Sequence, residues 1–588
     1  MRPRLLALCC LAFPLCASAQ DSATPTLHSG TQIVVVDVTV ADSHGQAITH
    51  LKPSDFVVLE DAAPQVVSHF EEHTAADQTK TPMMPPLGQN VYTNFTPVSE
   101  NVSTNILLID SLNTPVSSQS SNRQKLISFI KTMKPGTRLA VFDLSTRLML
   151  LQGFTSDPEL LLAAVHSDSA IQSSAGLPDS LGSAESLSDT VRIPSPQILG
   201  AMRQTEAVQS TEQDRLRVLT TLGAMNQLAR YLSGVPGRKN LLWVSGSFPL
   251  NFLPHAGIRN SFATTESFQT EVRETMNLLS RSQVAIYPID AGGVQNSPLA
   301  DASAGRYALG SNRVAGDVDT FSSQSMDTQG TMQRLAESTG GNAALETNDL
   351  QGALTKAIEA GSNYYSLVYS PTNKKNDGKY RKINVRLVSG SYKLGYRDGY
   401  YAADADAKSA TPHSAEKHDT VTPPDSMQLA MQRGAPTPTE IIFKALFAAS
   451  SVTSRQPAEG NVAAKSKPPY RLITVAYAAN PGDITMPSAP DGLRHVDLDF
   501  VALVYDRDGQ LFTQQINRVD VFAKPQAVQD FLREGVRYQQ QIAVPVKGEY
   551  YLRTGIHDLL GNKIGVIEVP VANIAITPQG QSAVQSPR

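Results

Sequence analysis

The stretch Asn105–Thr114, which reads NILLIDSLNT, decides the fold class of this chain. Its four consecutive apolar residues, Ile106–Ile109, end at a carboxylate, Asp110, and small polar residues follow. A continuous apolar run of this length predicts a strand that is buried on both faces, as in a parallel sheet. Ligands of open α/β sheets bind just beyond the carboxyl ends of the strands, so Asp110 stands where such a protein would bind its ligand.

An alternation of strands and helices extends from this stretch toward the C-terminus. Apolar runs predict further strands at Leu139–Phe142, Asn240–Gly246 and Val284–Asp290, and apolar residues at helical spacing lie between them. Long loops rich in Ser and Gly are predicted at 167–200 and 292–327. The alternation predicts an α/β domain with a mostly parallel, Rossmann-like central sheet.

The length of 588 residues favours three or four domains, and 41% hydrophobic with 18% charged residues is typical of globular units joined by polar linkers. Short β-branched segments separated by turns predict β structure on both sides of the α/β domain. The predicted division is a signal peptide at 1–19, a small N-terminal β unit at 30–73, a linker at 74–102, the α/β domain with a C-terminal strand extension at 103–401, a disordered linker at 402–468, an all-β sandwich of immunoglobulin-like type at 469–576 and a disordered tail at 577–588.

The first twenty residues have the composition of an export signal. Arg2 and Arg4 precede a short apolar core, and Ala17–Ala19 offers an A-x-A cleavage site. A lipoprotein alternative through Cys16 is disfavoured because the large Leu15 precedes the cysteine. All three cysteines lie in this peptide, so the exported chain would have no disulfide. We expect a periplasmic, extracellular or cell-surface protein.

Charge and hydropathy argue against two kinds of partner. The formal net charge is −4 and the chain has no basic run, which argues against nucleic-acid binding. Beyond the signal peptide no stretch reaches the roughly 18 apolar residues of a membrane-spanning helix. We expect an unidentified protein partner in the envelope or outside the cell.

Several ordered blocks in the chain resemble a known family. They are Val36–Val40, Asp55–Phe56, Leu59–Asp61, Phe154–Asp157, Pro236–Leu241, Ile286–Asp290, Thr339–Gly341, Tyr364–Tyr365, Tyr369–Pro371, Gly378–Ile383 and Gly399–Tyr401. Their order resembles the von Willebrand factor type A domain, and residues 33–401 are similar to the VWFA-related proteins described from acidobacterial genomes. That family has no settled biochemical activity, so the resemblance implies the fold and export rather than a reaction.

The resemblance also implies a metal site. Type A domains bind Mg²⁺ at the strand ends through Asp-x-Ser-x-Ser, a threonine and a second aspartate. Here the motif reads Asp110-Ser111-Leu112-Asn113-Thr114, and Gly246 stands where the second aspartate is expected. Asp110 and Thr114 match two ligands, whereas Leu112 cannot replace the middle serine. The resemblance therefore implies a degenerate metal-ion-dependent adhesion site at Asp110 and Thr114, with Mg²⁺ as the only cofactor considered, and a ligand rim formed by Ser111, Asn113, Ser245 and Ser247.

Three other features of the sequence are explained by structure and do not require a functional role. His69–His73 matches the H-x-x-E-H pattern of some zinc peptidases, but it follows a β-branched strand and lacks the helix that this chemistry needs. Strand packing explains the tyrosines 364, 365, 369, 400 and 401 as well as an exposed recognition surface does. Arg238 and Lys239 precede a buried strand and are most simply a solvated turn.

We therefore expect an exported, non-enzymatic binding, adhesion or scaffold protein that uses its type A-like domain to contact another protein. The alternative is a structural component of the cell envelope whose strand-end rim binds nothing. An exported metal-dependent hydrolase is the least favoured hypothesis. Calorimetry with divalent cations would separate metal-dependent adhesion from the alternatives.

Overall fold

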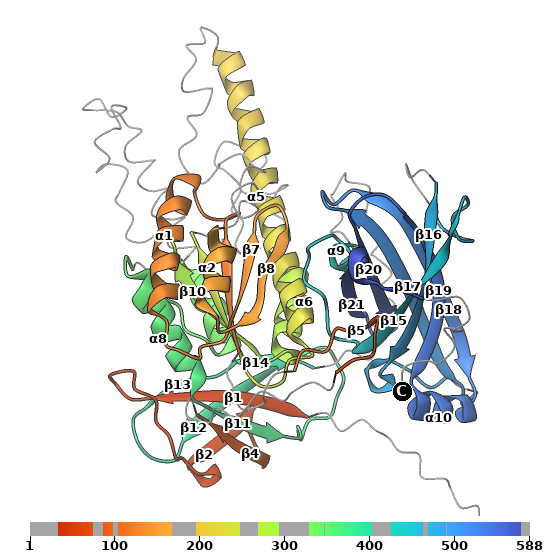
Figure 1. Ribbon diagram of the computed structural model, residues 1–588. Helices are drawn as coiled ribbons and strands as arrows, with labels where there is room; N and C mark the ends of the chain where they lie inside the picture. The colour runs from red at the N-terminus through yellow and green to blue at the C-terminus, as the bar shows by residue number, and fades with distance from the viewer. Residues whose placement is uncertain are drawn as a thin grey trace, which may run out of the picture.

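The computed structural model describes residues 33–74, 86–97, 104–166, 196–246, 268–292, 329–345, 347–402, 425–462, 468–489 and 491–577. Figure 1 shows an α/β domain, a β domain at one end of it, and a β-sandwich beside it. Within the described ranges no helix is long and apolar enough to cross a membrane. The predicted signal peptide, all but one residue of the predicted tail, and most of the loops 167–200 and 292–327 lie outside the described residues.

The α/β domain is built on a five-stranded sheet with the order β10-β9-β6-β7-β8. Its strands are β6 (Thr104–Asp110), β7 (Leu139–Leu144), β8 (Leu148–Thr155), β9 (Lys239–Ser245) and β10 (Val284–Asp290). The central strand β6 pairs in parallel with β7 and β9, and β9 pairs in parallel with β10, whereas β8 is antiparallel to β7. The prediction of a mostly parallel sheet centred on Ile106–Ile109 is confirmed.

Helices cover both faces of this sheet (Figure 1). They are α1 (Val116–Thr132), α2 (Pro158–His166) and α8 (Leu350–Ser362) on one face, and α5 (Pro196–Leu232), α6 (Gln269–Arg281) and the helical residues 329–339 on the other. Leu107 packs against α1, α2 and α8 on one face, and Ile106 and Leu108 pack against α5 and α6 on the other. The apolar run of β6 shows no alternation because both faces of the strand are buried.

The β domain consists of two four-stranded sheets with the orders β13-β1-β11-β4 and β14-β12-β2-β3. The N-terminal segment contributes β1 (Val34–Ala41), the short helix η1 (Pro53–Asp55), β2 (Phe56–Glu60), β3 (Ala63–Gln65) and β4 (Val67–His73), and a segment some three hundred residues later contributes β11 (Tyr364–Tyr369), β12 (Tyr380–Leu387), β13 (Lys393–Gly395) and β14 (Gly399–Tyr401). The predicted boundaries are wrong here: residues 364–401 are not an extension of the α/β domain. They complete the N-terminal β unit because β11 lies between β1 and β4 and satisfies the backbone groups of both.

The C-terminal sandwich has one sheet with the order β19-β16-β15-β22 and a second with the order β18-β17-β20-β21. Its elements are α9 (Ser426–Ala430), β15 (Phe443–Ser454), β16 (Tyr470–Ala479), η5 (Pro481–Asp483), β17 (Arg494–Asp506), β18 (Leu511–Ala523), α10 (Pro525–Glu534), β19 (Val536–Pro545), β20 (Tyr550–Asp558), β21 (Lys563–Pro570), η6 (Val571–Asn573) and β22 (Ile576–Thr577). A shared apolar core joins the two sheets, so the sandwich is present, while its immunoglobulin-like type stays a prediction. The predicted linker at 402–468 is wrong over α9 and β15, which the packing against later strands orders.

A short segment before the α/β domain belongs to this sandwich. β5 (Val91–Thr93) lies in the predicted linker 74–102 and pairs with β15, so the linker prediction is wrong for these residues. Asn94 Nδ2 donates to the carbonyl oxygens of Pro438 at 3.1 Å and Ile441 at 2.8 Å, and Asn94 Oδ1 accepts from Phe443 N at 3.0 Å. An asparagine side chain that bonds three backbone groups replaces a strand partner at this edge.

The end of α5 docks on the sandwich. Arg230 Nη1 lies 2.5 Å from Glu440 Oε2 and 2.6 Å from the carbonyl oxygen of Asn562. Thr439 Oγ1 donates to the carbonyl oxygen of Tyr231 at 2.7 Å and accepts from Gly234 N at 2.8 Å. A Cβ at Gly234 would lie 2.8 Å from Thr439, so this close approach requires glycine.

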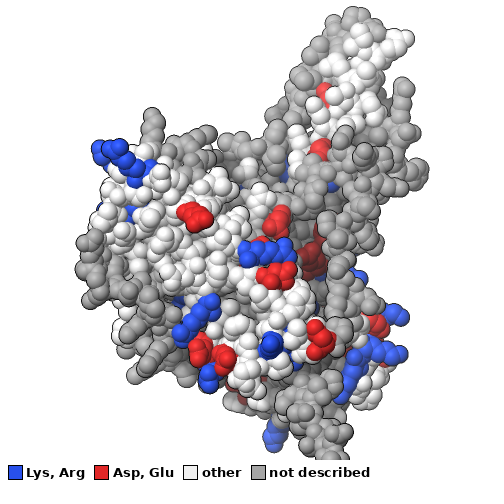
Figure 2. All heavy atoms as spheres, turned by 90° about the vertical axis from the view of Figure 1, so that its right-hand side faces the viewer, with Lys and Arg blue, Asp and Glu red and all other residues white. Residues whose placement is uncertain are grey.

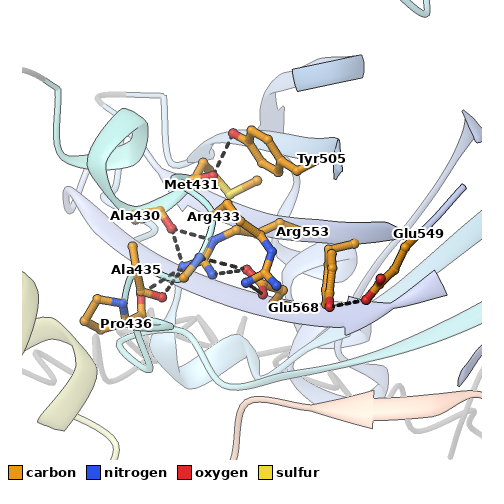
Figure 3. Close-up of polar contacts among 11 residues, drawn as sticks. Ala430, Met431, Arg433, Ala435, Pro436, Tyr505, Glu549, Arg553 and Glu568 are labelled. Carbon is orange, nitrogen blue, oxygen red and sulfur yellow. Dashed lines mark hydrogen bonds and ion pairs between the residues drawn. The ribbon is translucent and has the colours of Figure 1, made fainter. Parts of the chain in front are cut away.

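Arg553 on β20 holds the segment around α9 against the second sheet (Figure 3). Its side chain is 1% exposed and donates to the carbonyl oxygens of Ala430, Ala435 and Pro436 at 2.6–2.9 Å. Its Nη1 also donates to Glu568 Oε2 at 2.7 Å. The guanidinium therefore satisfies backbone groups of a non-repetitive segment that no strand partner reaches.

Candidate functional site

The strand ends bring the described residues of the predicted site together. Ser245 Oγ at the end of β9 donates to Asp110 Oδ2 at the end of β6 at 2.7 Å. Thr114 Oγ1 accepts from Gly246 N at 3.0 Å, and Ser111 Oγ donates to Asp143 Oδ1 at 2.7 Å. Asn113 bonds Asp110 from the same turn, while Ser247 lies outside the described residues.

Asp110 is 1% exposed, and both of its carboxylate oxygens accept hydrogen bonds. Oδ1 accepts from Asn113 N at 3.0 Å, and Oδ2 accepts from Trp243 Nε1 at 3.0 Å in addition to the Ser245 hydroxyl. Asn113 Nδ2 lies 3.2 Å from Oδ1 and 3.0 Å from Oδ2. Burial raises the pKa of Asp110, and the hydrogen bonds from Ser245, Asn113 and Trp243 offset part of this rise.

This arrangement does not fit a divalent cation. Mg²⁺ needs oxygen lone pairs directed at one point, whereas the lone pairs of Asp110 face N–H and O–H donors. Leu112 packs in the apolar core. A Cβ at Gly246 would lie 2.9 Å from the carbonyl oxygen of Asn113, so a second carboxylate has no room at this position. The contacts of Asp110 and Thr114 are those of turn anchors, and the geometry does not support the metal role predicted for them.

Helix α5 covers these strand ends. Asn113 Nδ2 donates to Thr221 Oγ1 on this helix at 2.8 Å, and Arg217 Nη1 donates to the carbonyl oxygen of Leu112. Asn113, Thr114 and Ser245 are 2%, 6% and 0% exposed. The prediction of an accessible ligand rim is therefore wrong for Asn113 and Ser245, and only Ser111 is half-buried.

The peptidase-like motif lies on strand β4, not on a helix. Glu72 Oε1 accepts from the backbone N of His50 at 2.6 Å and from the Tyr365 hydroxyl at 3.2 Å, and the ring of His73 stacks on that of Tyr364 at 4.4 Å. Alternation along a strand directs Glu72 away from the face of His69 and His73. The motif therefore lacks the geometry of a zinc peptidase, and Tyr364 and Tyr365 pack inside the domain.

A cluster of His495, Asp497 and Asp520 on the sandwich is the one group in the described ranges with three candidate ligand atoms within 4.8 Å of one another. Arg518 donates to both oxygens of Asp497, at 2.8 Å and 2.6 Å. His495 Nε2 lies 2.8 Å from Asp520 Oδ1, and its ring stacks on Phe522. These contacts make it a cross-strand group in which Arg518 and Asp497 form an ion pair and His495 bonds Asp520.

A second group of buried polar side chains lies at the opposite end of the strands of the α/β sheet, where β9 and β10 begin. Arg238 and Lys239 are 3% and 2% exposed, so their interpretation as a solvated turn is wrong. Lys239 Nζ donates to the carbonyl oxygen of Ser282 at 2.8 Å. Burial lowers the pKa of Lys239 to about 7, although the nearby Asp37 acts in the opposite direction.

The sequence carries one signal of this buried group. Asp37 interrupts the β-branched run Val36–Val40, and its buried carboxylate accepts from Ser366 Oγ at 2.7 Å and from Gln283 Nε2 at 3.3 Å. A carboxylate in such a strand indicates a polar contact on that face. Nothing local to Arg238 and Lys239 indicates their burial, because their partners Ser282, Tyr287, Gly340 and Tyr364 are distant in sequence.

Replacing Lys239 with methionine is expected to flatten the pH dependence of stability. Lys239 has a pKa of about 7 in the fold and 10.5 in the unfolded chain, so between these values the unfolded chain binds more protons. The free energy of unfolding of the wild-type chain therefore rises with pH across this window, by up to about 1.4 kcal/mol per pH unit from this group. Denaturant titrations of both chains at several pH values measure the difference.

The control for this experiment is Lys393→Met, which removes an exposed lysine from β13. It should leave the pH dependence unchanged. Equal slopes for Lys239→Met and the wild-type chain above pH 7 would show that the Lys239 ammonium is not desolvated in the fold.

The solved structures that this chain resembles include two distant likenesses. An aerotolerance-related membrane protein from Bacteroides fragilis has 12% sequence identity and a TM-score of 0.23, over 44% of this chain and 98% of that protein's chain. The VWA domain of SpRpn10 has 10% identity and a TM-score of 0.12, over 32% of this chain and 88% of that domain's chain. No family model and no curated protein matches the sequence. Both TM-scores lie below 0.5, so the α/β assignment rests on the sheet order and not on these likenesses.

Proposed function

We propose that this chain is an exported, non-enzymatic scaffold or adhesion protein that binds a protein partner without a divalent cation. The observation that supports this proposal is the state of Asp110, whose carboxylate is bonded by Asn113, Trp243 and Ser245 beneath α5. A carboxylate satisfied in this way stabilises the fold and offers no ligand to a metal. The strand ends serve as a structural centre, and the partner binds another surface.

The way in which the domains interlock supports a scaffold. β5 joins the sandwich before the chain enters the α/β domain, and β11–β14 return to the N-terminal β unit after it. The buried contact between Arg230 and Glu440 then ties α5 to the sandwich. Domains joined by shared sheets and buried ion pairs keep a fixed geometry, unlike domains on a flexible linker.

Surface charge is mixed on the face of the molecule that carries the sandwich. Figure 2 shows Lys and Arg side chains interspersed with Asp and Glu on this face. An interspersed surface produces no strong field of one sign, so recognition there would depend on shape and local contacts rather than long-range attraction.

A structural envelope component with no ligand site is the second candidate, and the buried strand-end rim favours it over metal-dependent adhesion. A hydrolase has less support, because His69 and His73 lie on a strand that separates them from Glu72. The two leading candidates differ in whether a specific partner exists.

The test is binding to a purified partner in the presence of Mg²⁺ and of EDTA. The chain would be cross-linked to envelope proteins, the captured protein purified, and the dissociation constant measured by calorimetry. We expect the same dissociation constant in both buffers. Weaker binding in EDTA would refute metal-independent adhesion, and failure to reconstitute any complex would favour the structural component.

The complete chain is the material for this test. A fragment limited to 103–401 would separate β11 from β1 and β4 and expose the edges of all three strands. Non-specific capture by those edges would then be mistaken for partner binding.

A further inference from the structure

A cavity of about 270 Å³ lies between the α/β domain and the β domain. β1 contributes Val35 and Asp37 to its wall, α6 contributes Met276 and Ser280, and Arg238 and Arg397 contribute guanidinium groups. The cavity lies where β14 approaches α6. Its size suits a small organic molecule.

Neither of the two guanidinium groups in this wall forms a direct ion pair with a described residue. Arg238 Nη2 donates to the carbonyl oxygen of Gly340 at 2.6 Å and to the Tyr287 hydroxyl at 3.2 Å, and its Nε has no hydrogen-bond partner. Arg397 Nη2 donates to the carbonyl oxygen of Val35 at 2.7 Å, and its Nη1 donates to the carbonyl oxygen and the hydroxyl of Ser280, whereas its Nε also has no partner. Within the described ranges neither guanidinium has a carboxylate oxygen within 4.0 Å.

The charge of the cavity wall is therefore unbalanced. Among the described residues that line it, Asp37 is the one carboxylate, and it interacts electrostatically with both guanidinium groups. Its two oxygens accept hydrogen bonds from Ser366 and Gln283. The ammonium of Lys239 lies behind the same wall and interacts electrostatically with Asp37. Buried cations without paired anions are costly, and a bound anion would offset that cost.

Aromatic rings also line the cavity, and the Arg397 guanidinium lies 5.8 Å from the centroid of the Tyr400 ring. Tyr380, Tyr400 and Tyr401 line it, and the rings of Tyr380 and Tyr401 lie 5.0 Å apart in an edge-to-face contact. The Tyr400 hydroxyl is engaged, because it donates to Glu60 Oε2 at 3.0 Å. A wall that combines cations with aromatic rings fits a ligand that has an anionic group and an apolar body.

We propose that this cavity binds a small organic carboxylate with an aromatic or aliphatic body, with its carboxylate toward Arg238 and Arg397 and its body against Tyr380 and Tyr401. The site is at the opposite end of the strands from Asp110 and does not depend on the partner binding proposed above. A free carboxylic acid and the C-terminal carboxylate of a short peptide share this chemistry.

The test is calorimetric titration of the purified chain with benzoate, with the neutral isostere benzamide, with inorganic phosphate and with a dipeptide that ends in phenylalanine. We expect saturable binding of benzoate and none of benzamide. Arg397→Gln should weaken benzoate binding about tenfold or more, since it removes one charged donor. Arg386→Gln, which removes an exposed arginine from β12, should leave it unchanged. Tighter binding of the dipeptide than of benzoate would identify a peptide terminus as the source of the carboxylate.

A second variant keeps the test decisive if Arg397→Gln does not fold. Asn277 lines the cavity from α6, and Asn277→Phe fills the space without changing any charge. Loss of benzoate binding in this variant supports the site. The proposal is overturned if benzamide binds as well as benzoate, if phosphate alone binds, if no probe binds, or if benzoate binds equally to the wild-type chain and to the folded Arg397→Gln or Asn277→Phe variants.

Discussion

Replacing Arg553 with methionine is expected to lower the free energy of unfolding of the C-terminal sandwich by about 3–5 kcal/mol. The side chain is buried, and the change removes every hydrogen bond that it makes to the carbonyl oxygens of Ala430, Ala435 and Pro436 (Figure 3). Each carbonyl would remain buried without a donor, at a cost of about 1–3 kcal/mol. Methionine fills most of the vacated volume, so the loss would report polar contacts more than a cavity.

Two measurements check this prediction. Denaturant unfolding gives the change in stability, and amide hydrogen exchange over residues 426–436 shows whether that segment opens first. The matched control is Arg433→Met, because Arg433 also bonds Glu568, at 2.8 Å, but is partly exposed and stacks on Tyr551 at 3.6 Å. Its loss should cost about 1 kcal/mol. Equal effects of the two substitutions would contradict a special role for the buried guanidinium.

Replacing Asp110 with alanine is expected to destabilise the α/β domain by about 1–3 kcal/mol for each buried donor that it leaves without an acceptor, whether or not Mg²⁺ is present. The substitution removes the acceptor for Trp243 Nε1, the Ser245 hydroxyl and the amide groups of Asn113, all of which are buried. Trp243 is the only tryptophan in the chain, so its fluorescence reports unfolding at the affected contact. Denaturant titration followed by this signal measures the effect.

The control for Asp110 is Asp42→Ala. Asp42 also accepts two backbone N–H groups, from His44 and Gln46 at 2.8 Å, but in an exposed turn where water can replace it, so its loss should have a much smaller effect than the loss of Asp110. A ligand that binds only the folded state raises stability in proportion to its concentration over its dissociation constant. A rise in the wild-type unfolding midpoint with Mg²⁺ that disappears in Asp110→Ala would restore the metal site.

The adjacency of strand ends could be predicted from sequence, but the state of Asp110 could not. Parallel strands end at one edge, so Asp110 and Ser245 were expected to meet there, and they do. Whether a carboxylate at that edge holds a cation or a turn depends on which donors face it. Trp243 and Asn113 reach it only because of the strand register and the turn after β6, and α5 then covers the result.

The predicted domain boundaries were wrong for a related reason. The segment 364–401 was recognised as strands, yet strand pairing uses backbone groups that every residue offers, so sequence does not name the partner. β11 pairs with β1 and β4 across some three hundred residues, and β5 pairs with β15 across about the same separation. Segments without strong local periodicity, such as 86–97 and 425–442, were predicted as linkers although long-range contacts order them.

The sequence by itself determined the central strand and the layer arrangement of the α/β domain. Four adjacent apolar residues at 106–109 are removed from water only when both faces of the strand are buried. The segments with helical spacing that follow form the helices that cover these faces. Only the tertiary structure decided that the oxygens of Asp110 are occupied by hydrogen-bond donors and that Arg238 and Lys239 are buried. It also decided that the N-terminal strand β1 and the much later strand β11 share a sheet. Burial on a strand follows from local pattern, whereas hydrogen-bond partners, the covering of a sheet edge and strand pairing depend on residues distant in sequence.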